Sequence, residues 1–167
     1  YLNVGARQVP VSVRDPITEM EFVLVPGACY GLGVTDERPD QVCLDPYYIG
    51  AYEVTFDQYD RFARATGRDL PDDEGWGRRG RPVINVGVYD ALNFAKWLSR
   101  KTGVHYRLPT EVEWEVAAAA EPAADGTSLA PSKRRFPWGD EAPRPDQANL
   151  DGYALGTIDV AALPAGD

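Results

Sequence analysis

The sequence predicts a single folded domain in which short strands come first, three helices follow and long loops come last. In the first fifty residues, apolar runs of strand length are bounded by Gly and Pro. The middle of the chain carries repeated start and stop signals for helices. From Glu121 onward the chain is rich in Pro, Gly, Asp and Ala and shows no sustained periodicity, which is typical of loops. With 167 residues, 44% of them hydrophobic, the chain can bury a core.

The strands are predicted from short apolar runs. Residues 1–20 are expected to form an extended arm or linker, because Val9, Val11 and Val13 alternate along the chain as in an edge strand. The compact domain is expected over residues 21–167, and residues 21–26 are its first predicted strand. Two further strands are predicted around the two cysteines.

Two of the predicted helices carry clear end signals. Thr55 and Gln58 have the spacing of a capping box, and Gly67 is placed to end the helix that follows. A second helix is predicted over residues 90–102, with Gly103 as its stop.

The third predicted helix begins after Pro109, where Thr110 and Glu113 form another capping box. Arg107, just before it, is expected to form a structural ion pair with a nearby acid, namely Glu111, Glu113 or Glu115. The buried face of this helix is expected to consist of Trp114, Ala117 and Ala118.

Cys29 and Cys43 are the two cysteines of the chain. If the segment between them turns, their strands can lie side by side and form a disulfide, which we favour over two free buried thiols in a cytosolic domain. The chain starts at Tyr1 rather than Met, as it does after removal of a signal peptide, so a periplasmic or extracellular location is expected. Two cysteines and the distant His105 do not supply a zinc site, and a Cys–His catalytic pair lacks an identifiable orienting residue.

Charge excludes some classes of partner. There are 17 basic and 26 acidic side chains, which gives a formal net charge of −9. Such a chain repels nucleic acid and anionic membranes. No apolar run is long enough to cross a bilayer.

Several motifs together resemble one known family, the formylglycine-generating enzymes, also called the sulfatase-modifying factor domain. The most characteristic is the string Arg-Leu-Pro-Thr-Glu-Val-Glu-Trp-Glu over residues 107–115. The others, in the family's order, are residues 21–27, 29–33, 48–55, 81–86, Asp90-Ala91 with Trp97-Leu-Ser, Phe-Pro-Trp-Gly-Asp at 136–140, and Ala148-Asn149. The resemblance implies an α+β domain of the complex C-type-lectin-like kind, rich in loops.

The resemblance also implies what is missing. Members that make formylglycine are copper-dependent oxidases whose paired active-site cysteines follow the Pro-Trp-Gly motif at a distance, and the sequence ends before that region. Cys29 and Cys43 lie too early to be that pair. We therefore expect a domain incomplete at its C-terminus, with no catalytic residues of its own.

Calcium is the cofactor that the resemblance still permits. The matching positions are Asn149, the carbonyl of Leu150, and Asp151 or Asp159. Oxygen ligands of this kind suit calcium, although Asn and Asp are also ordinary turn residues.

Three functions remain open. The first, which we favour, is a non-catalytic exported module that binds a protein or glycan within an assembly. Its candidate contact residues are Trp76 and Tyr153, together with Tyr47, Tyr48 and Trp138, although core packing is expected for Trp97, Trp114 and also Trp138. The second is the N-terminal part of a copper-dependent oxidase whose cysteines come from another segment or chain. The third is an assembly subunit whose arm adds a strand to a neighbouring copy.

Overall fold

The computed structural model describes residues 2–4, 7–32, 40–122, 129–131, 135–150 and 154–164. The chain forms two compact units, each made of separate stretches of sequence. The β-rich unit comprises residues 1–13, 22–49 and 109–140, and the helical unit comprises residues 14–21, 50–108 and 141–167. The predicted boundary at residue 20 between arm and domain stays a prediction.

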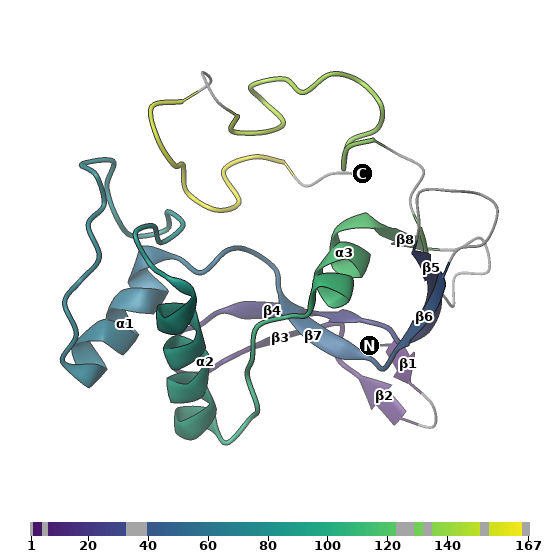
Figure 1. Ribbon diagram of the computed structural model, residues 1–167, viewed down its shortest axis with the longest axis horizontal. Coiled ribbons are helices and arrows are strands. Elements are labelled where there is room, and N and C mark those ends of the chain that lie inside the picture. Colours follow the sequence, from purple (N-terminus) through teal and green to yellow (C-terminus); the bar gives the residue numbers. More distant parts are fainter. Residues whose placement is uncertain are drawn as a thin grey trace. The chain divides into compact units, whose positions relative to one another are not determined.

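Short antiparallel strand pairs are prominent in the β-rich unit (Figure 1). Strand β5 (Ala28–Leu32) pairs with β6 (Asp40–Leu44), so that Cys29 lies directly opposite Cys43. Strand β1 (Leu2–Val4) pairs with β2 (Arg7–Val9), and β8 (Ala120–Pro122) pairs with β9 (Leu129–Pro131). The β8–β9 pair corrects the prediction that the chain after Glu121 has no regular elements. Strands of three residues are too short to show a period of two in the sequence.

A three-stranded sheet has the order β3-β4-β7, formed by β3 (Ser12–Arg14), β4 (Glu21–Val25) and β7 (Tyr47–Gly50). The predicted strand over residues 21–26 is confirmed. Beside it, the chain approaches itself closely at Gly27, where a Cβ atom would lie 2.6 Å from Cδ of Pro46. A residue with a side chain would force these two segments apart.

Helix α3 (Glu111–Ala119) belongs to the β-rich unit. Its Val116 and the strand residue Val25 are the buried centre of a small core. The predicted capping box is present, since the Thr110 N–H donates to Oε2 of Glu113 at 2.7 Å and the Glu113 N–H donates to Oγ1 of Thr110 at 3.2 Å. The hydroxyl of Tyr47 donates to the backbone carbonyl of Glu113 at 2.5 Å.

The prediction that Trp114 faces the core is wrong, because its side chain is 62% exposed. Val112 and Val116, four residues apart, define the buried stripe of α3 instead. At about 100° per residue, a position two residues from each of them lies on the opposite side of the helix.

In the helical unit, α1 (Phe56–Thr66) and α2 (Val88–Thr102) lie side by side (Figure 1). Helix α1 begins with the predicted Thr55–Gln58 capping box and ends at Gly67, which is left-handed with φ of 67°. Helix α2 starts two residues before the predicted position and ends at Gly103 as expected. Between the helices, aromatic rings pack at centroid distances of 5.3–6.0 Å, formed by Tyr59, Phe62, Phe94 and Trp97.

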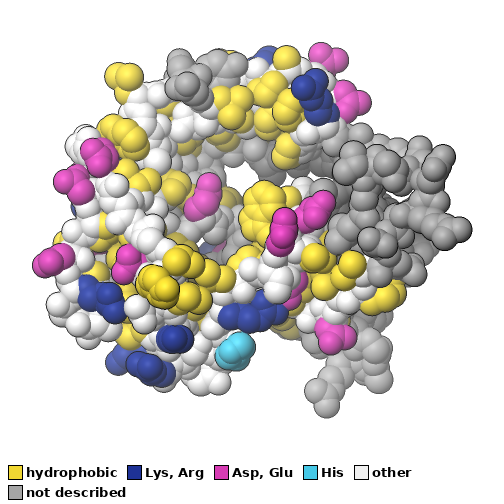
Figure 2. All heavy atoms as spheres, viewed as in Figure 1, with side chains coloured by type: hydrophobic (Ala, Val, Ile, Leu, Met, Phe, Trp, Pro, Cys, Tyr) yellow, Lys and Arg dark blue, Asp and Glu magenta, His cyan; other side chains and the backbone are white. Residues whose placement is uncertain are grey.

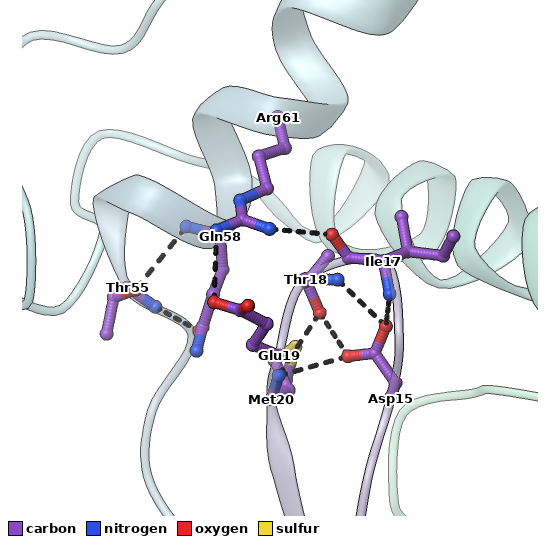
Figure 3. Close-up of polar contacts among 8 residues, drawn as sticks. All are labelled: Asp15, Ile17, Thr18, Glu19, Met20, Thr55, Gln58 and Arg61. Carbon is purple, nitrogen blue, oxygen red and sulfur yellow. Dashed lines mark hydrogen bonds and ion pairs between the residues drawn. The ribbon is translucent and has the colours of Figure 1, made fainter.

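A turn around Asp15 is tied to α1 by hydrogen bonds (Figure 3). The buried carboxylate of Asp15 accepts from the N–H groups of Ile17, Thr18 and Met20, and from the Thr18 hydroxyl. From α1, Arg61 donates to the carbonyl of Ile17 at 2.9 Å. This turn was not predicted from the sequence, although an Asp followed by Thr three residues later favours such side-chain-to-backbone bonds.

Candidate functional site

The segment from Gly67 to Gly87 joins α1 to α2 without forming a helix or strand, and we call it the anchored loop. Loops of this length in compact domains usually have a function or are disordered. The contacts described next hold this one firmly, which favours a function.

The strongest anchor is an ion pair between the loop and α1. The guanidinium of Arg78 donates to Asp60 through Nη2 at 2.6 Å to Oδ1 and through Nε at 3.2 Å to Oδ2. Asp60 is only 3% exposed, and Arg64 one turn later also donates to it, at 3.3 Å. Nη1 of Arg78 donates to the carbonyl of Pro71 at 2.7 Å, and its guanidinium carbon lies 4.3 Å from the ring centroid of Phe56. This geometry uses most of the donors of Arg78 in a partly desolvated place, where charged hydrogen bonds are strong.

A second anchor closes the loop on itself. The side-chain amide of Asn85 donates to the carbonyl of Asp72 at 3.0 Å and to Oε1 of Glu74 at 2.9 Å. Near α1, the N–H of Phe56 donates to the carbonyl of Arg81 at 3.0 Å. The loop is thus attached at both its middle and its end.

The anchored loop holds several residues in a strained conformation. Positive φ angles occur in Glu74 (55°), Arg79 (59°) and Asn85 (59°). The left-handed region costs a residue with a side chain on the order of 1 kcal/mol, so such residues persist only where their surroundings enforce them. They cluster at binding and catalytic sites, which identifies this loop as the candidate site.

A second segment, residues 154–164, packs against the anchored loop, and we call it the docked segment. A Cβ atom on Gly156 would lie 2.2 Å from the Trp76 ring, so the glycine lies directly against the indole. The N–H of Val160 donates to the carbonyl of Gly80 at 2.8 Å. Trp76 itself remains 41% exposed.

This contact brings together residues that the sequence analysis had selected separately. The side-chain amide of Asn149 donates to the carbonyl of Gly156 at 3.0 Å, and the carboxyl carbon of Asp159 would be 3.4 Å from a Cβ on Gly80. Leu150 is exposed. Asp151 and Tyr153 lie outside the described residues.

The calcium site stays a prediction, and two oxygen atoms near this place bear on it. Because the nitrogen of the Asn149 amide is bound to Gly156, its oxygen is the end that could serve a cation. Among the described side chains, the buried Oγ1 of Thr157, next to Gly156, lacks a hydrogen-bond partner. Oxygen atoms of this kind are the ligands of calcium. No group of three or more His, Cys, Asp or Glu placed to hold a metal occurs within the described ranges.

An open cavity of about 400 Å³ lies at the base of the anchored loop. Its wall includes Tyr59, Arg68, Asp69, Leu70, Asn85 and Asp90. Arg68 lies 3.6 Å from a carboxylate oxygen of Asp90 and 5.2 Å from the ring centroid of Phe62. The other oxygen of Asp90 accepts the N–H of Gly87 at 3.0 Å, so Asp90 also caps α2.

Burial raises the pKa of Tyr59 above its ordinary value, and the nearby negative charge of Asp90 raises it further, while Arg68 opposes the change. The phenol is therefore neutral at physiological pH. These cavity residues carry no motif in the sequence, where only the length of the loop between the two helices indicates a site.

The other selected residues have structural or surface positions. Cys29 and Cys43 form the predicted disulfide. Trp97 is buried as predicted, Trp138 is half-buried and stacks on Phe136 at 5.3 Å, and the hydroxyl of Tyr48 donates to the carbonyl of Pro10 at 2.6 Å. Nη1 of Arg107 donates to the carbonyl of Leu108 at 3.1 Å, and its pairing with a carboxylate stays a prediction.

The acidic side chains on the face drawn in Figure 2 are spread singly or in pairs rather than gathered in one region. Across the helices that the structure describes, none has the length and apolar character that a membrane span requires.

Comparison with known proteins identifies the family. The model of the sulfatase-modifying factor enzyme 1-like domain matches residues 8–156. The chain belongs to this family. The predicted family and its fold of helices with antiparallel strands are confirmed. The description of that fold as C-type-lectin-like stays a prediction.

Relatives within this family include enzymes. The chain is 31% identical to the hercynine oxygenase of Mycolicibacterium smegmatis, over 95% of the chain and 44% of that protein. It is 40% identical to the formylglycine-generating enzyme of Streptomyces coelicolor, over 39% of the chain and 16% of that protein. It therefore spans less than half the length of these curated relatives.

A solved structure supports the same fold. PvdO from Pseudomonas aeruginosa matches 96% of this chain and 69% of its own, with a TM-score of 0.67 and 26% sequence identity.

Proposed function

We propose that this member of the sulfatase-modifying factor family acts as a protein-binding module, and that the anchored loop with Trp76 is its docking surface. The observation that carries the proposal is that the loop is held in one conformation. The Arg78–Asp60 ion pair anchors it although three of its residues are strained, and its tryptophan stays 41% exposed. A large aromatic side chain on a preorganised loop loses little entropy when it is covered by a partner.

The test compares two exposed aromatic residues of the helical unit. The chain is immobilised and exposed to the extracellular protein fraction of its source, and the retained proteins are identified. We expect Trp76→Ala to lose a set of proteins that the wild type and the control Tyr52→Ala both retain, because Tyr52 is exposed outside the loop. Identical sets for all three chains would contradict docking at the loop.

We also propose that residues 1–167 supply no catalytic group for an oxidase. Both thiols of the sequence are used in the disulfide between β5 and β6, so neither is available as a nucleophile or copper ligand. Incubation with copper and a sulfatase-type cysteine peptide should give no aldehyde product by mass spectrometry. Formation of that product by the purified chain would overturn the non-catalytic function.

The second candidate is the N-terminal part of an oxidase, supported by the 40% identity to a formylglycine-generating enzyme over 39% of the chain. In this case copper and the catalytic cysteines would act in a segment or chain outside these 167 residues. Intact-mass measurement of the native protein decides between the two candidates, since a longer polypeptide with a downstream cysteine pair favours the oxidase.

Calcium is part of the proposal as a structural ion at the docked segment, held by oxygen atoms near Asn149 and Asp159. A ligand that binds only the folded state at one hundred times its Kd stabilises that state by about 2.7 kcal/mol. Calcium should therefore raise the Tm of the wild type and a chelator should reverse the rise. Asp159→Asn should respond less than the control Asp45→Asn, whose exposed carboxylate lies in the β-rich unit. An unchanged Tm in the wild type would contradict the site.

Export is proposed from the disulfide, because such bonds persist mainly in oxidising compartments. The native protein should be found, oxidised, in the periplasmic or extracellular fraction. Recovery of the protein with two free thiols in the cytosol would contradict this location.

A further inference from the structure

The cavity at the base of the anchored loop has the features of a ligand site of its own. Trp76 is not among the residues named on its wall. Arg68 is the cation on its wall, and Asp69 and Asp90 are its two carboxylates. Arg68 is already engaged by Asp90 and by the ring of Phe62. Asp69 therefore adds a negative charge that the cavity wall itself does not balance.

Tyr59 adds a polar group that has no partner in the described protein. Its side chain is only 5% exposed, and its ring is stacked on Phe94 and met edge-on by Phe62. Tyr59 lines the cavity, and because its ring is covered we infer that its hydroxyl end is the part that reaches the cavity. No described residue forms a hydrogen bond with this hydroxyl. It is not among the fully buried side-chain oxygens of the described residues that lack a partner, so it keeps contact with solvent. A buried phenol without a hydrogen-bond partner is placed to form a hydrogen bond with a ligand in the cavity.

The rest of the wall is apolar. Leu70, Pro71 and Val86 line the cavity beside the polar groups. A fitting ligand therefore has an aliphatic stem and a compact cationic head with several hydrogen-bond donors. A lysine side chain has this chemistry, with three donors on an ammonium group at the end of four methylene groups. The net charge of −9 favours the approach of such a basic partner.

We propose that the cavity receives a lysine side chain from the protein that docks on this module, with its ammonium group bound by Asp69, Asp90 and the hydroxyl of Tyr59. This inference rests on the proposed protein-binding function and names the chemistry of the partner.

The test uses small probes, so that it does not depend on knowing the partner. Nα-acetyl-lysine N-methylamide, which keeps its side-chain ammonium group, is titrated into the isotope-labelled chain, and the chemical shifts of the backbone amides are followed by NMR. We expect saturable shifts at Asp69, Leu70 and Asn85, and none with N-acetyl-norleucine N-methylamide, which lacks the ammonium group. The matching arginine derivative should bind at least about threefold more weakly, because its planar guanidinium is bulkier than the compact ammonium group of lysine.

Variants identify the groups that bind. Asp69→Asn should weaken binding of the lysine probe about threefold, the effect of a partly exposed charge pair. Tyr59→Phe, which keeps the packed ring, should weaken it about twofold to tenfold by removing one hydrogen bond. The control Asp45→Asn removes the same charge in the β-rich unit and should bind like the wild type.

Equal shifts with the norleucine probe would overturn the proposal, as would equal affinities of wild type and Asp69→Asn. Stronger binding of glutarate than of the lysine probe would also overturn it, by showing that Arg68 governs the cavity. The test of the cavity can fail independently of the docking function. If Trp76→Ala loses its partner proteins but the lysine probe does not bind, the docking surface is supported and the cavity site is not. If the lysine probe binds but Trp76→Ala keeps its partners, the cavity site is supported and the docking surface is not.

Discussion

At the scale of single residues, Arg78 decides whether the anchored loop keeps its shape. Its guanidinium contacts the carboxylate of Asp60 on α1, the carbonyl of Pro71 within the loop and the ring of Phe56. A buried ion pair of this kind contributes little net stability compared with apolar residues, yet breaking it is costly because one charge is left buried alone. We infer that the pair is kept for the position of the loop.

Arg78→Ala should therefore lower the free energy of unfolding by about 3 kcal/mol, since Asp60 stays buried with Arg64 as its remaining cation. Urea denaturation followed by circular dichroism measures this change. In the control Arg14→Ala, the ion pair with Glu21 is exposed, and the loss should stay below about 1 kcal/mol.

The double variant Asp60→Asn/Arg78→Ala should recover part of the lost stability, because it removes the buried charge as well. Equal losses of stability in Arg78→Ala and Arg14→Ala would show that the Arg78–Asp60 pair is not the anchor. A double variant no more stable than Arg78→Ala would show the same.

At the scale of elements, the anchored loop and the docked segment position each other through glycine. Gly156 has φ of 100° and leaves no room between its backbone and the Trp76 ring. The docked segment forms no helix or strand of its own, so this contact, the bond from Val160 to Gly80 and the bond from Asn149 to Gly156 help to order it.

Gly156→Ala should separate the docked segment from Trp76 and lower the free energy of unfolding by about 1–3 kcal/mol, because the added methyl overlaps the ring and the backbone angle disfavours a side chain. Proteolysis within residues 141–164 should also become faster. The matched control is Gly67→Ala, where φ is also positive but no atom lies within 4 Å of the added methyl, so the loss should be about 1 kcal/mol.

Trp76→Ala removes the other side of this contact and should likewise make the proteolysis faster. An unaltered proteolysis pattern in Gly156→Ala would show that the two segments do not depend on this contact.

At the scale of the whole molecule, two compact units are each assembled from distant stretches of one chain. Each has its own means of stability. The helical unit has the aromatic core between α1 and α2, while the β-rich unit has a smaller apolar core and a disulfide across β5 and β6. Small cores with short strands commonly depend on such covalent links.

Cys29→Ser/Cys43→Ser should lower the free energy of unfolding by about 3 kcal/mol, the entropy of closing a loop of about 15 residues. Thermal unfolding with and without reductant measures it: reductant should lower the Tm of the wild type to that of the double variant and leave the variant unchanged. Equal Tm values for oxidised wild type and variant would show that the bond contributes no stability.

Much of this fold could be predicted because its signals are local. The capping boxes at Thr55 and Thr110 and the glycines after α1 and α2 lie within a few residues of the helix ends they set. The strands around the two cysteines, their pairing and the family motifs could also be found along the chain. Trp114 was placed wrongly, since an aromatic residue on a short helix can belong to either side until packing partners decide.

The sequence by itself therefore determined the helices, the disulfide and the family, because each depends on residue types at short, regular spacings. The tertiary structure decided the functional surface. Asp60 and Arg78 are 18 positions apart, and Trp76 and Gly156 lie far apart along the chain, so no periodicity connects them. Asp60 and Arg78 meet because the segment between α1 and α2 bends back onto α1, and Trp76 meets Gly156 because residues 154–164 pack on that loop.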